Sequence, residues 1–452
     1  MSQRWRISCS TVFATAILTL TSLIKADVKV LCIGDSLTRE YDIMSVDNGE
    51  GGTFPSPDSN PGVANTMNWV EILTAKRNSD FDFGHYATQG HDYNYAVPGY
   101  DSVMWIEEII EAGFTDPLFY VRFRMREDYD EVDVVVIMVG GNDVRGNYGD
   151  LYDPEPGDVT PTQFKNTVLT NLGKIIDEIR DVNETVPIVL ADVPDLTAAP
   201  DIIADHPDPA KRANVTVIVN ELNQDIAALA ANRGATLAPV SSLTDRLLSP
   251  DPVYIGAIEM IKDKDPMRNN RPLYLFCKEG LHPSTNGQAV IANTMVTAIN
   301  TATGSSIQPL ASREIISLLP GIEANQPYLG WAGAAGLTDL SMTADADGDG
   351  IPNLGEYLLG LNPLVVNNDH LMDLETIDGA DTLTLSYTPD TDALLLADVE
   401  VKYSTQLESW LPLPSGSLID MGNGTFQVQL PTADIPGGND RAFLRMEFVL
   451  KP

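Results

Sequence analysis

Basic residues are scarce in this sequence. Its 452 residues include 28 Lys and Arg against 64 Asp and Glu, which gives a formal net charge of −36. A surface with this excess of negative charge repels phosphate backbones, so we exclude nucleic acid as a partner. The excess is typical of a solvated acidic surface, and it also suits cation binding or a salty medium.

Cysteine and histidine are also rare. Of the three cysteines, Cys9 lies in the N-terminal segment, so Cys32 and Cys277 can form at most one disulfide in the rest of the chain. An oxidising compartment would allow that pair, whereas small buried core cysteines are the commoner case, and the sequence leaves the choice open. His85 and His91 lie close together but lack further metal ligands at a suitable spacing, so we expect no histidine metal site.

Long apolar runs are missing after the N-terminus. Residues 1–26 begin with Arg4 and Arg6, continue with a mostly apolar stretch over 12–24 and offer a cleavage point at Ala26. This pattern predicts an export signal and a secreted or periplasmic protein. No later run is long enough to cross a bilayer, so we expect no stable membrane insertion.

Residues 27–303 alternate between strand and helix patterns. Apolar runs predict strands at 28–33, 134–139, 186–193 and 235–240, and continuous apolar strands are typical of a parallel sheet buried on both faces. Helical spacing of apolar residues lies between them, with a capping box at Thr160–Gln163 and a stop at Gly234. The alternation predicts a doubly wound α/β domain, in which sites form at the carboxyl ends of the strands.

Four short segments carry the chemistry. They are Gly34–Leu37, Asn94–Gly99, Gly140–Asp143 and Glu279–Pro283. Together they supply a serine, a histidine with a carboxylate three residues before it, and separate donors for an oxyanion, which are the parts of a serine acyl-transfer site. In that interpretation Ser36 is the nucleophile, His282 is its base, and Glu279 orients the imidazole.

The four motifs, in this order, resemble the SGNH (GDSL-type) hydrolase family over roughly residues 27–300. The resemblance implies a flavodoxin-like parallel sheet, ester hydrolysis without a catalytic cofactor, and an oxyanion hole made by the backbone N–H groups of Ser36 and Gly99 and the side chain of Asn142. The family usually has Asp where this chain has Glu279, and this chain has Ala96 where the family often has an earlier glycine.

An acidic loop after residue 340 predicts a calcium site. Carboxylates stand at the first, third, fifth and twelfth positions of a twelve-residue loop, Gly350 occupies the turn at the sixth, and the seventh and ninth offer a backbone carbonyl and an amide. The expected ligands are Asp345, Asp347, Asp349, Ile351, Asn353 and Glu356. The loop resembles those of dockerin-like and thrombospondin type 3-like tails, which implies structural Ca²⁺ with no part in catalysis.

We therefore expect a linker and calcium-loop region at 304–363 and a β-rich accessory module at 364–452, where short alternating runs are separated by turn residues. Within the resembled family, exported members with accessory modules often deacetylate polysaccharides. The expected function is a carbohydrate O-acetylesterase acting on an acylated small molecule or polysaccharide. The alternatives are a short-chain carboxylester or lipid hydrolase and a non-catalytic glycan-binding protein, and the oligomeric state stays open.

Overall fold

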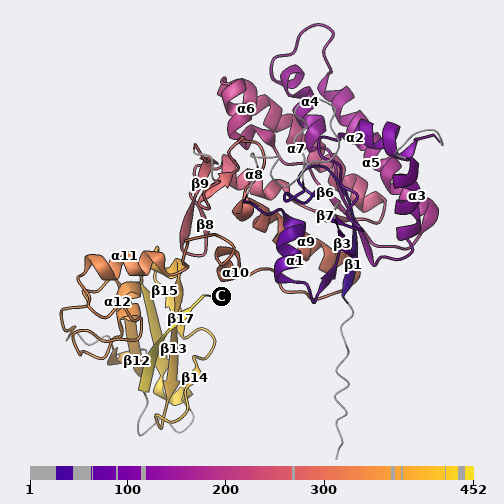
Figure 1. Ribbon diagram of the computed structural model, residues 1–452. Helices are drawn as coiled ribbons and strands as arrows, with labels where there is room; N and C mark the ends of the chain where they lie inside the picture. Colours follow the sequence, from indigo (N-terminus) through magenta and orange to yellow (C-terminus); the bar gives the residue numbers. More distant parts are fainter. Residues whose placement is uncertain are drawn as a thin grey trace, which may run out of the picture.

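The computed structural model describes residues 27–43, 63, 65–87, 90–113, 119–266, 270–367, 372–377, 380–422, 424–435 and 443–451. The expected export signal at 1–26 lies outside the described residues. An α/β region comes first along the chain, and a smaller, strand-rich region follows it (Figure 1).

A five-stranded parallel sheet forms the centre of the α/β region. Its order is β2-β1-β5-β6-β7, with β1 and β5 as neighbours where the order reverses. The strands are β1 (Val28–Gly34), β2 (Phe81–Asp82), β5 (Val134–Met138), β6 (Ile188–Ala191) and β7 (Thr236–Ala238). Every residue of β5 and β6 is buried, which explains the continuous apolar runs. The predicted parallel sheet is confirmed, and the reversal between β1 and β5 is where such folds form their sites.

Helices cover both faces of this sheet (Figure 1). The predicted capping box is present: Thr160 accepts a hydrogen bond from the Gln163 N–H, and the helix after it runs from Pro161 to Val182. The long helix before β7 ends at Asn232, close to Gly234, whose φ of +62° suits glycine. The helices are α1 (Trp69–Lys76), α2 (Ser102–Met104) with the π-helical η2 (Trp105–Ile110), α3 (Phe119–Asp128), α4 (Gly141–Tyr152), α5 (Pro161–Val182), α6 (Pro200–Asp205), α7 (Pro209–Asn232), α8 (Ser241–Leu248) and α9 (Thr285–Thr303).

The core of the α/β region continues past residue 303. Ile307, Leu310 and Leu319 are buried in the same apolar cluster as the central strands, on either side of α10 (Ser312–Ile316). The Arg77 guanidinium holds Glu314 of this helix in two hydrogen bonds of 2.7 and 2.8 Å. The segment expected to begin a linker therefore packs against the sheet region, and Thr301–Thr303 form the end of α9.

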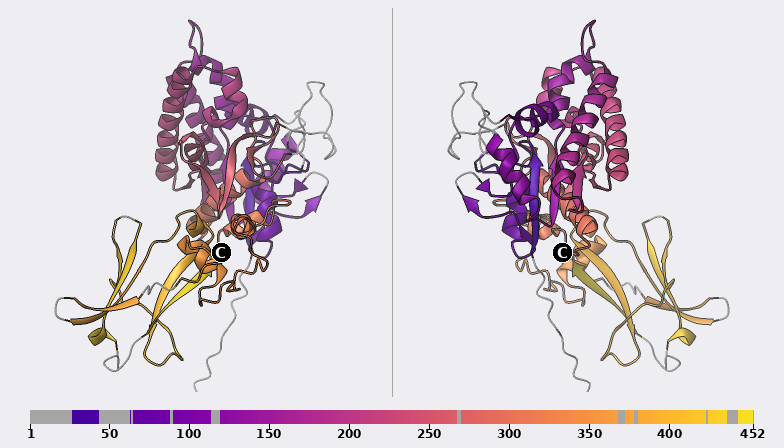
Figure 2. Two further views of the ribbon diagram at one scale, coloured as in Figure 1. Left: turned by 90° about the vertical axis from the view of Figure 1, so that its left-hand side faces the viewer. Right: turned by 90° about the vertical axis from the view of Figure 1, so that its right-hand side faces the viewer.

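A hairpin of the α/β region extends to the C-terminal region and packs against it (Figures 1 and 2). It is formed by β8 (Val253–Ile255) and β9 (Ile258–Lys264), and β10 (Tyr274–Phe276) pairs with β9 in parallel. Ala257 at the hairpin tip packs with Tyr328 and Leu354 of the C-terminal region. The segment between β7 and β10 therefore has two roles, since its helix α8 lines a pocket described below and its hairpin tip contacts the C-terminal region.

Two antiparallel sheets form most of the C-terminal region. One has the order β11-β12-β16-β15 and the other β14-β13-β17. Their facing side chains form one apolar cluster that includes Leu383, Val401 and Val428, at the alternating positions that the sequence marked. The elements are α11 (Gln326–Ala334), α12 (Asn353–Leu359), β11 (Met372–Ile377), β12 (Ala380–Tyr387), β13 (Ala397–Ser404), β14 (Leu411–Pro412), β15 (Leu418–Asp420), β16 (Phe426–Pro431) and β17 (Phe443–Leu450).

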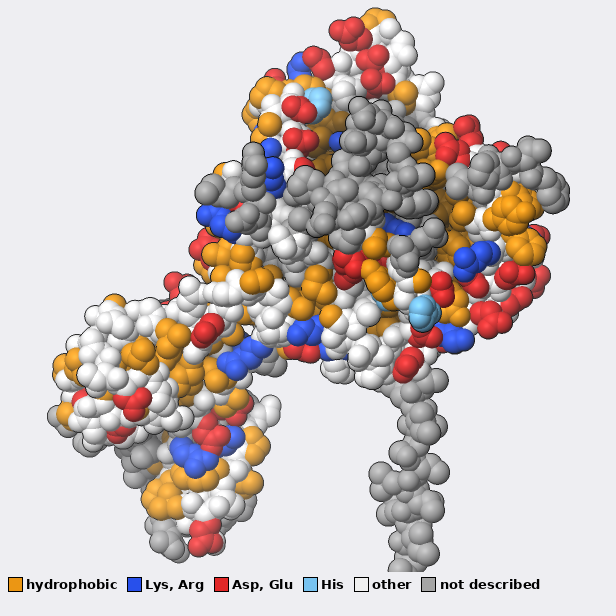
Figure 3. All heavy atoms as spheres, in the orientation of Figure 1, with side chains coloured by type: hydrophobic (Ala, Val, Ile, Leu, Met, Phe, Trp, Pro, Cys, Tyr) orange, Lys and Arg blue, Asp and Glu red, His pale blue; other side chains and the backbone are white. Residues whose placement is uncertain are grey.

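The surface agrees with the composition. Acidic side chains are spread over both regions on the face shown in Figure 3, with basic side chains between them. Among the described residues, none of the helices combines the length and the apolar character that a membrane span requires.

Candidate active site

Ser36 lies in a tight turn directly after β1. The Asp35 carboxylate accepts a hydrogen bond from the Leu37 N–H at 2.9 Å, and the Asp35 carbonyl accepts one from the Thr38 N–H at 3.1 Å. A Cβ on Gly34 would stand 2.7 Å from the Thr38 side chain, so only glycine fits before this turn. Burial raises the pKa of Asp35 to about 6, although the Leu37 N–H and His282 oppose the rise.

The serine, the histidine and the glutamate form a continuous chain of contacts. His282 Nε2 lies 2.7 Å from Ser36 Oγ, and His282 Nδ1 lies 2.8 Å from Glu279 Oε1. Both distances are those of good hydrogen bonds. The histidine and glutamate come from the loop after β10, which the Cys277 N–H closes by donating to the His282 carbonyl at 2.8 Å.

Glu279 folds back over its own loop to reach the imidazole. Its Oε1 also accepts the His282 N–H at 2.9 Å, and its Oε2 accepts the Leu281 N–H. Burial raises the pKa of Glu279, but the hydrogen bonds and charge of His282 and the loop N–H groups outweigh burial and hold the pKa below 4.5. The carboxylate therefore stays ionised beside the ring, although this chain has Glu where the resembled family usually has Asp.

Two of the three predicted oxyanion donors come from the first turn of α4 and from the loop that contains Gly99. Asn142 is in the first turn of α4, after the end of β5, and its Nδ2 donates to the Tyr100 carbonyl at 3.0 Å. An amide nitrogen carries two hydrogens, so this bond fixes the side chain while leaving a donor for substrate. Gly99 precedes Tyr100 with a φ of +83°, in a loop that the Val97 N–H ties to the Gly34 carbonyl at 3.0 Å.

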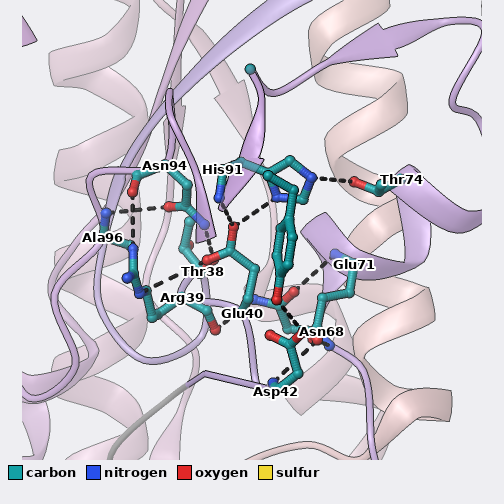
Figure 4. A network of polar contacts seen from close by, with 12 residues as sticks. Thr38, Arg39, Glu40, Asp42, Asn68, Glu71, Thr74, His91, Asn94 and Ala96 are labelled. Atoms are coloured by element: carbon teal, nitrogen blue, oxygen red, sulfur yellow. Dashed lines mark hydrogen bonds and ion pairs between the residues drawn. The ribbon is translucent and has the colours of Figure 1, made fainter. Parts of the chain in front are cut away.

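A buried polar network fixes the backbone that follows the serine (Figure 4). Asn94, the first residue of the second motif, donates from Nδ2 to the Thr38 carbonyl at 2.9 Å. The Glu40 carboxylate accepts hydrogen bonds from His91, at 3.0 Å from the backbone N–H and 2.9 Å from Nδ1. Glu71 accepts the Tyr41 N–H at 3.0 Å. His91 thus serves this network.

A pocket opens beside the predicted triad. Ser36, His282 and Asn142 line it, whereas Gly99 is not one of its lining residues. Most of its wall is apolar and comes from the ends of β5 and β10, the loop after β6, and helices α8 and α9. The apolar lining includes Leu37, Met138, Leu196, Ala199, Val240, Leu243, Leu247, Phe276, Leu281 and Ile291, and the polar lining includes Asp35, Arg145, Asp195 and Thr244.

The four sequence motifs do not predict most of this lining. Asp195 and Leu196 follow the end of β6, so the rule that sites lie at the carboxyl ends of strands was the available signal. Leu243, Thr244 and Leu247 lie on α8, which carries no motif and reaches the site only through the fold.

Cys32 and Cys277 are both buried, and they form no disulfide with each other.

Comparison with known proteins identifies the family. Residues 32–290 match the GDSL-like lipase/acylhydrolase family, which is more than half of the chain. The chain belongs to this family. Its members are serine hydrolases that act on carboxylic esters and need no catalytic cofactor. No curated protein matches the chain.

Several solved structures overlap the same part of this GDSL-like acylhydrolase. An α/β hydrolase from the metagenome of Lake Arreo, Spain, is 19% identical, with 62% of this chain and 98% of that chain covered and a TM-score of 0.33. An acetylxylan esterase from Geobacillus stearothermophilus is 16% identical, with 61% and 95% covered and a TM-score of 0.33. An extracellular lipase from Streptomyces rimosus is 16% identical, with 61% and 100% covered and a TM-score of 0.36. Overlaps of this extent do not select a substrate.

The predicted calcium loop brings oxygen ligands together. Asp345, Asp347 and Asp349 each offer a carboxylate oxygen, and these oxygens all lie within 4.8 Å of one another. Both carboxylate oxygens of the fully buried Glu356, and Oδ2 of Asp347, have no hydrogen-bond partner among the described residues. Burial raises the pKa of Glu356 to about 7, and the three aspartates add to the rise. Such buried, unpaired oxygens fit a hard cation such as Ca²⁺.

Of the other two expected ligands, Asn353 also has a buried oxygen, Oδ1, without a hydrogen-bond partner among the described residues. Asn353 is buried and opens α12, and its Nδ2 donates to the carbonyls of Asp339 at 3.2 Å and Ser341 at 3.1 Å. Ile351 follows Gly350, whose φ is +97°, and donates its N–H to Asp349 Oδ1 at 2.8 Å. Gly355, beside Glu356, packs so closely on β17 that a Cβ would stand 2.4 Å from the Phe448 ring. The loop is therefore packed directly against the C-terminal sheets.

Proposed function

We propose that this protein is an exported serine esterase that works through Ser36, His282 and Glu279. The contact of 2.7 Å between His282 Nε2 and Ser36 Oγ, within a pocket, is the observation that supports it best. Neutral imidazole takes the hydroxyl proton as Oγ attacks the ester carbonyl. Glu279 holds the proton on Nδ1 and stabilises the imidazolium that forms.

The attack creates a tetrahedral intermediate whose oxygen carries a negative charge. The N–H groups of Ser36 and Gly99 and the Asn142 amide donate to this oxygen. His282 then returns the proton to the leaving alcohol, which departs and leaves an acyl group on Ser36. Water, activated by the same imidazole, hydrolyses this acyl-enzyme and regenerates the serine.

The proposed substrate is an acetylated carbohydrate, with a short-chain carboxylester or a lipid as the second candidate. The apolar pocket wall beside Ser36 favours the second candidate, because Leu196, Leu243 and Leu247 would bury the chain of a longer acyl group. A series of 4-nitrophenyl esters from acetate to octanoate separates the two. A maximum of kcat/KM at acetate supports the acetylesterase, and a maximum at butyrate or beyond supports the second candidate.

Substitution of the serine tests the chemistry itself. Ser36→Ala should abolish hydrolysis of 4-nitrophenyl acetate while the melting temperature changes little. Ser415→Ala is the matched control, because Ser415 is exposed in the C-terminal region. Activity that persists in Ser36→Ala contradicts the mechanism. A wild-type protein that binds acetylated polysaccharide but hydrolyses no ester would instead be a non-catalytic glycan-binding protein.

We also propose that the acidic loop binds structural Ca²⁺ and that residues 1–26 direct export. The orphaned oxygens of Glu356 and Asp347 support the calcium site, since a cation would give them partners. Ca²⁺ should raise the melting temperature of the full chain, and Glu356→Gln should reduce that rise, while hydrolysis of a small ester stays unchanged. Export is tested by N-terminal sequencing of the secreted protein, which should begin near residue 27.

A further inference from the structure

Asp195 is a buried acid in the pocket that the proposed mechanism does not use. It follows β6 and is 2% exposed. Its backbone N–H donates to Thr244 Oγ1 at 3.0 Å, and its Oδ1 accepts the Thr197 N–H at 2.9 Å. Its Oδ2 has no hydrogen-bond partner among the described residues. Buried polar atoms rarely lack a partner, so this oxygen calls for one from outside the chain.

The position of Asp195 ties it to the proposed reaction. Val193 lies two residues before Asp195 and packs against Gly140, where an added Cβ would be 2.7 Å from Val193 Cγ2. The loops after β5 and β6 therefore lie side by side. Asp195 therefore lines the same pocket as Ser36, Asn142 and His282. The hydrogen bonds to Thr244 and Thr197 fix its backbone and one oxygen, which leaves Oδ2 as the group with a free function.

The rest of the pocket supports a polar group of the substrate at this place. Arg145, one helical turn after Asn142, also lines the pocket and is exposed, and it makes no hydrogen bond or ion pair within the described part of the chain. A carboxylate only accepts hydrogen bonds and a guanidinium only donates them. A pocket with a mostly apolar wall and these two groups suits a ligand that combines apolar surface with a hydroxyl.

We propose that Asp195 is a specificity-determining residue, and that its Oδ2 accepts a hydrogen bond from a hydroxyl group carried by the ester substrate. This inference rests on the proposed esterase function. A site built to bond a hydroxyl discriminates against an analogue without one, because its buried acceptor is then left unpaired. The hydroxyl belongs either to the alcohol, as in a sugar or glycerol ester, or to the acyl group, as in a hydroxyacyl ester.

Two matched pairs of substrates test the inference on the full chain. Glycerol monoacetate against propyl acetate reports a hydroxyl on the alcohol, and ethyl 3-hydroxybutyrate against ethyl butyrate reports one on the acyl group. The wild type should prefer the hydroxylated member of one pair by about 10- to 150-fold in kcat/KM, as expected for a hydrogen bond to a charged group. The pair that shows the preference identifies the source.

Asp195→Asn should weaken that preference. The amide keeps an oxygen for the Thr197 N–H and puts a neutral NH₂ group in place of Oδ2, so the substrate hydroxyl loses its charged acceptor and can only accept from the amide. The ratio within the pair should therefore fall by about five- to tenfold. Hydrolysis of 4-nitrophenyl acetate, which carries no hydroxyl, reports any general effect of the substitution on the pocket, so the inference is tested by the ratio within the pair and not by the absolute rate.

Asp192→Asn is the matched control for a general effect of losing a buried charge. Asp192 is also buried at the end of β6, but both its oxygens are bonded by Ser241, at 2.8 Å from N and 2.7 Å from Oγ. If Asp192→Asn disturbs the structure, it should lower kcat/KM for all substrates by the same factor and leave the ratio within each pair unchanged. The inference is overturned if the wild type shows no preference in either pair, a result that does not depend on whether Asp195→Asn folds. It is also overturned if folded Asp195→Asn keeps the full preference of the wild type. Failure of the wild type on every ester overturns the proposed function instead.

Discussion

Glu279→Gln should slow ester hydrolysis without unfolding the protein. The carboxylate accepts three hydrogen bonds: Oε1 accepts His282 Nδ1 and the His282 N–H, and Oε2 accepts the Leu281 N–H. Glutamine has one acceptor oxygen, so in either orientation its NH₂ group faces at least one N–H donor. If the oxygen stays with the backbone of Leu281, the amide nitrogen faces His282 and favours the wrong imidazole tautomer.

The size of the effect follows from the bond that is lost. A hydrogen bond to a charged group contributes about 1.5–3 kcal/mol, which corresponds to a fall of about 10- to 150-fold in kcat. The loss of the preferred tautomer adds to this, up to the roughly 10⁴-fold fall known for the equivalent change in serine proteases. Glu279→Asp should also lose activity. The aspartate side chain is one methylene shorter, so it could not accept from His282 Nδ1 and keep both hydrogen bonds from the backbone N–H groups of Leu281 and His282.

The assay is steady-state hydrolysis of 4-nitrophenyl acetate by the full chain, with the melting temperature measured in parallel. The expected result is a fall in kcat with little change in KM, because the imidazolium forms only as the transition state is approached. Glu259→Gln is a matched control, since Glu259 is an exposed residue of β9. The weakest hydrogen bond considered above corresponds to a fall of about tenfold. If the activity of Glu279→Gln stays within about twofold of the wild type, then Glu279 does not orient His282.

Three further predictions concern the oxyanion hole, the C-terminal packing and an ion pair. Asn142→Ala should lower kcat by about 10²- to 10³-fold with KM nearly unchanged, and a rise in KM alone would place Asn142 in substrate binding. Gly355→Ala should destabilise the C-terminal region by about 1–3 kcal/mol in thermal unfolding, because the new Cβ would stand 2.4 Å from Phe448. Gly330→Ala, in α11 with open space around its Cα, should be neutral or stabilising by up to about 1 kcal/mol, and equal effects would contradict the packing argument. The hydrogen bonds from Arg77 lower the pKa of Glu314 from 4.5 to about 2, so this pair stabilises the folded state above pH 4.5 and its contribution disappears as the pH falls towards 2. Glu314→Gln should therefore lower the melting temperature at pH 7 but not at pH 2, and a loss of equal size at both pH values would mean that the charge is not responsible.

The sequence determined the parts of this protein that depend on local chemistry. Continuous apolar runs predict buried strands, and this places β1 and β5 and, at the ends of those strands, the motifs of Ser36 and Asn142. Periodicity and caps define α5, and the alternation at Leu383–Tyr387 and Phe426–Leu430 defines strands of the C-terminal sheets. The spacing of acidic residues in the loop at 345–356 is local in the same way.

Tertiary structure alone decided what depends on residues far apart in the chain. Nothing in the sequence shows that Ile307–Leu319 complete the core of the first region, or that the hairpin tip at Ala257 packs on the C-terminal helices. The pocket wall from α8 and the free Oδ2 of Asp195 are equally invisible in the sequence. Local propensity fixes whether a segment is a helix or a strand, but burial and hydrogen-bond satisfaction are set by which segments meet, and that is a property of the folded chain.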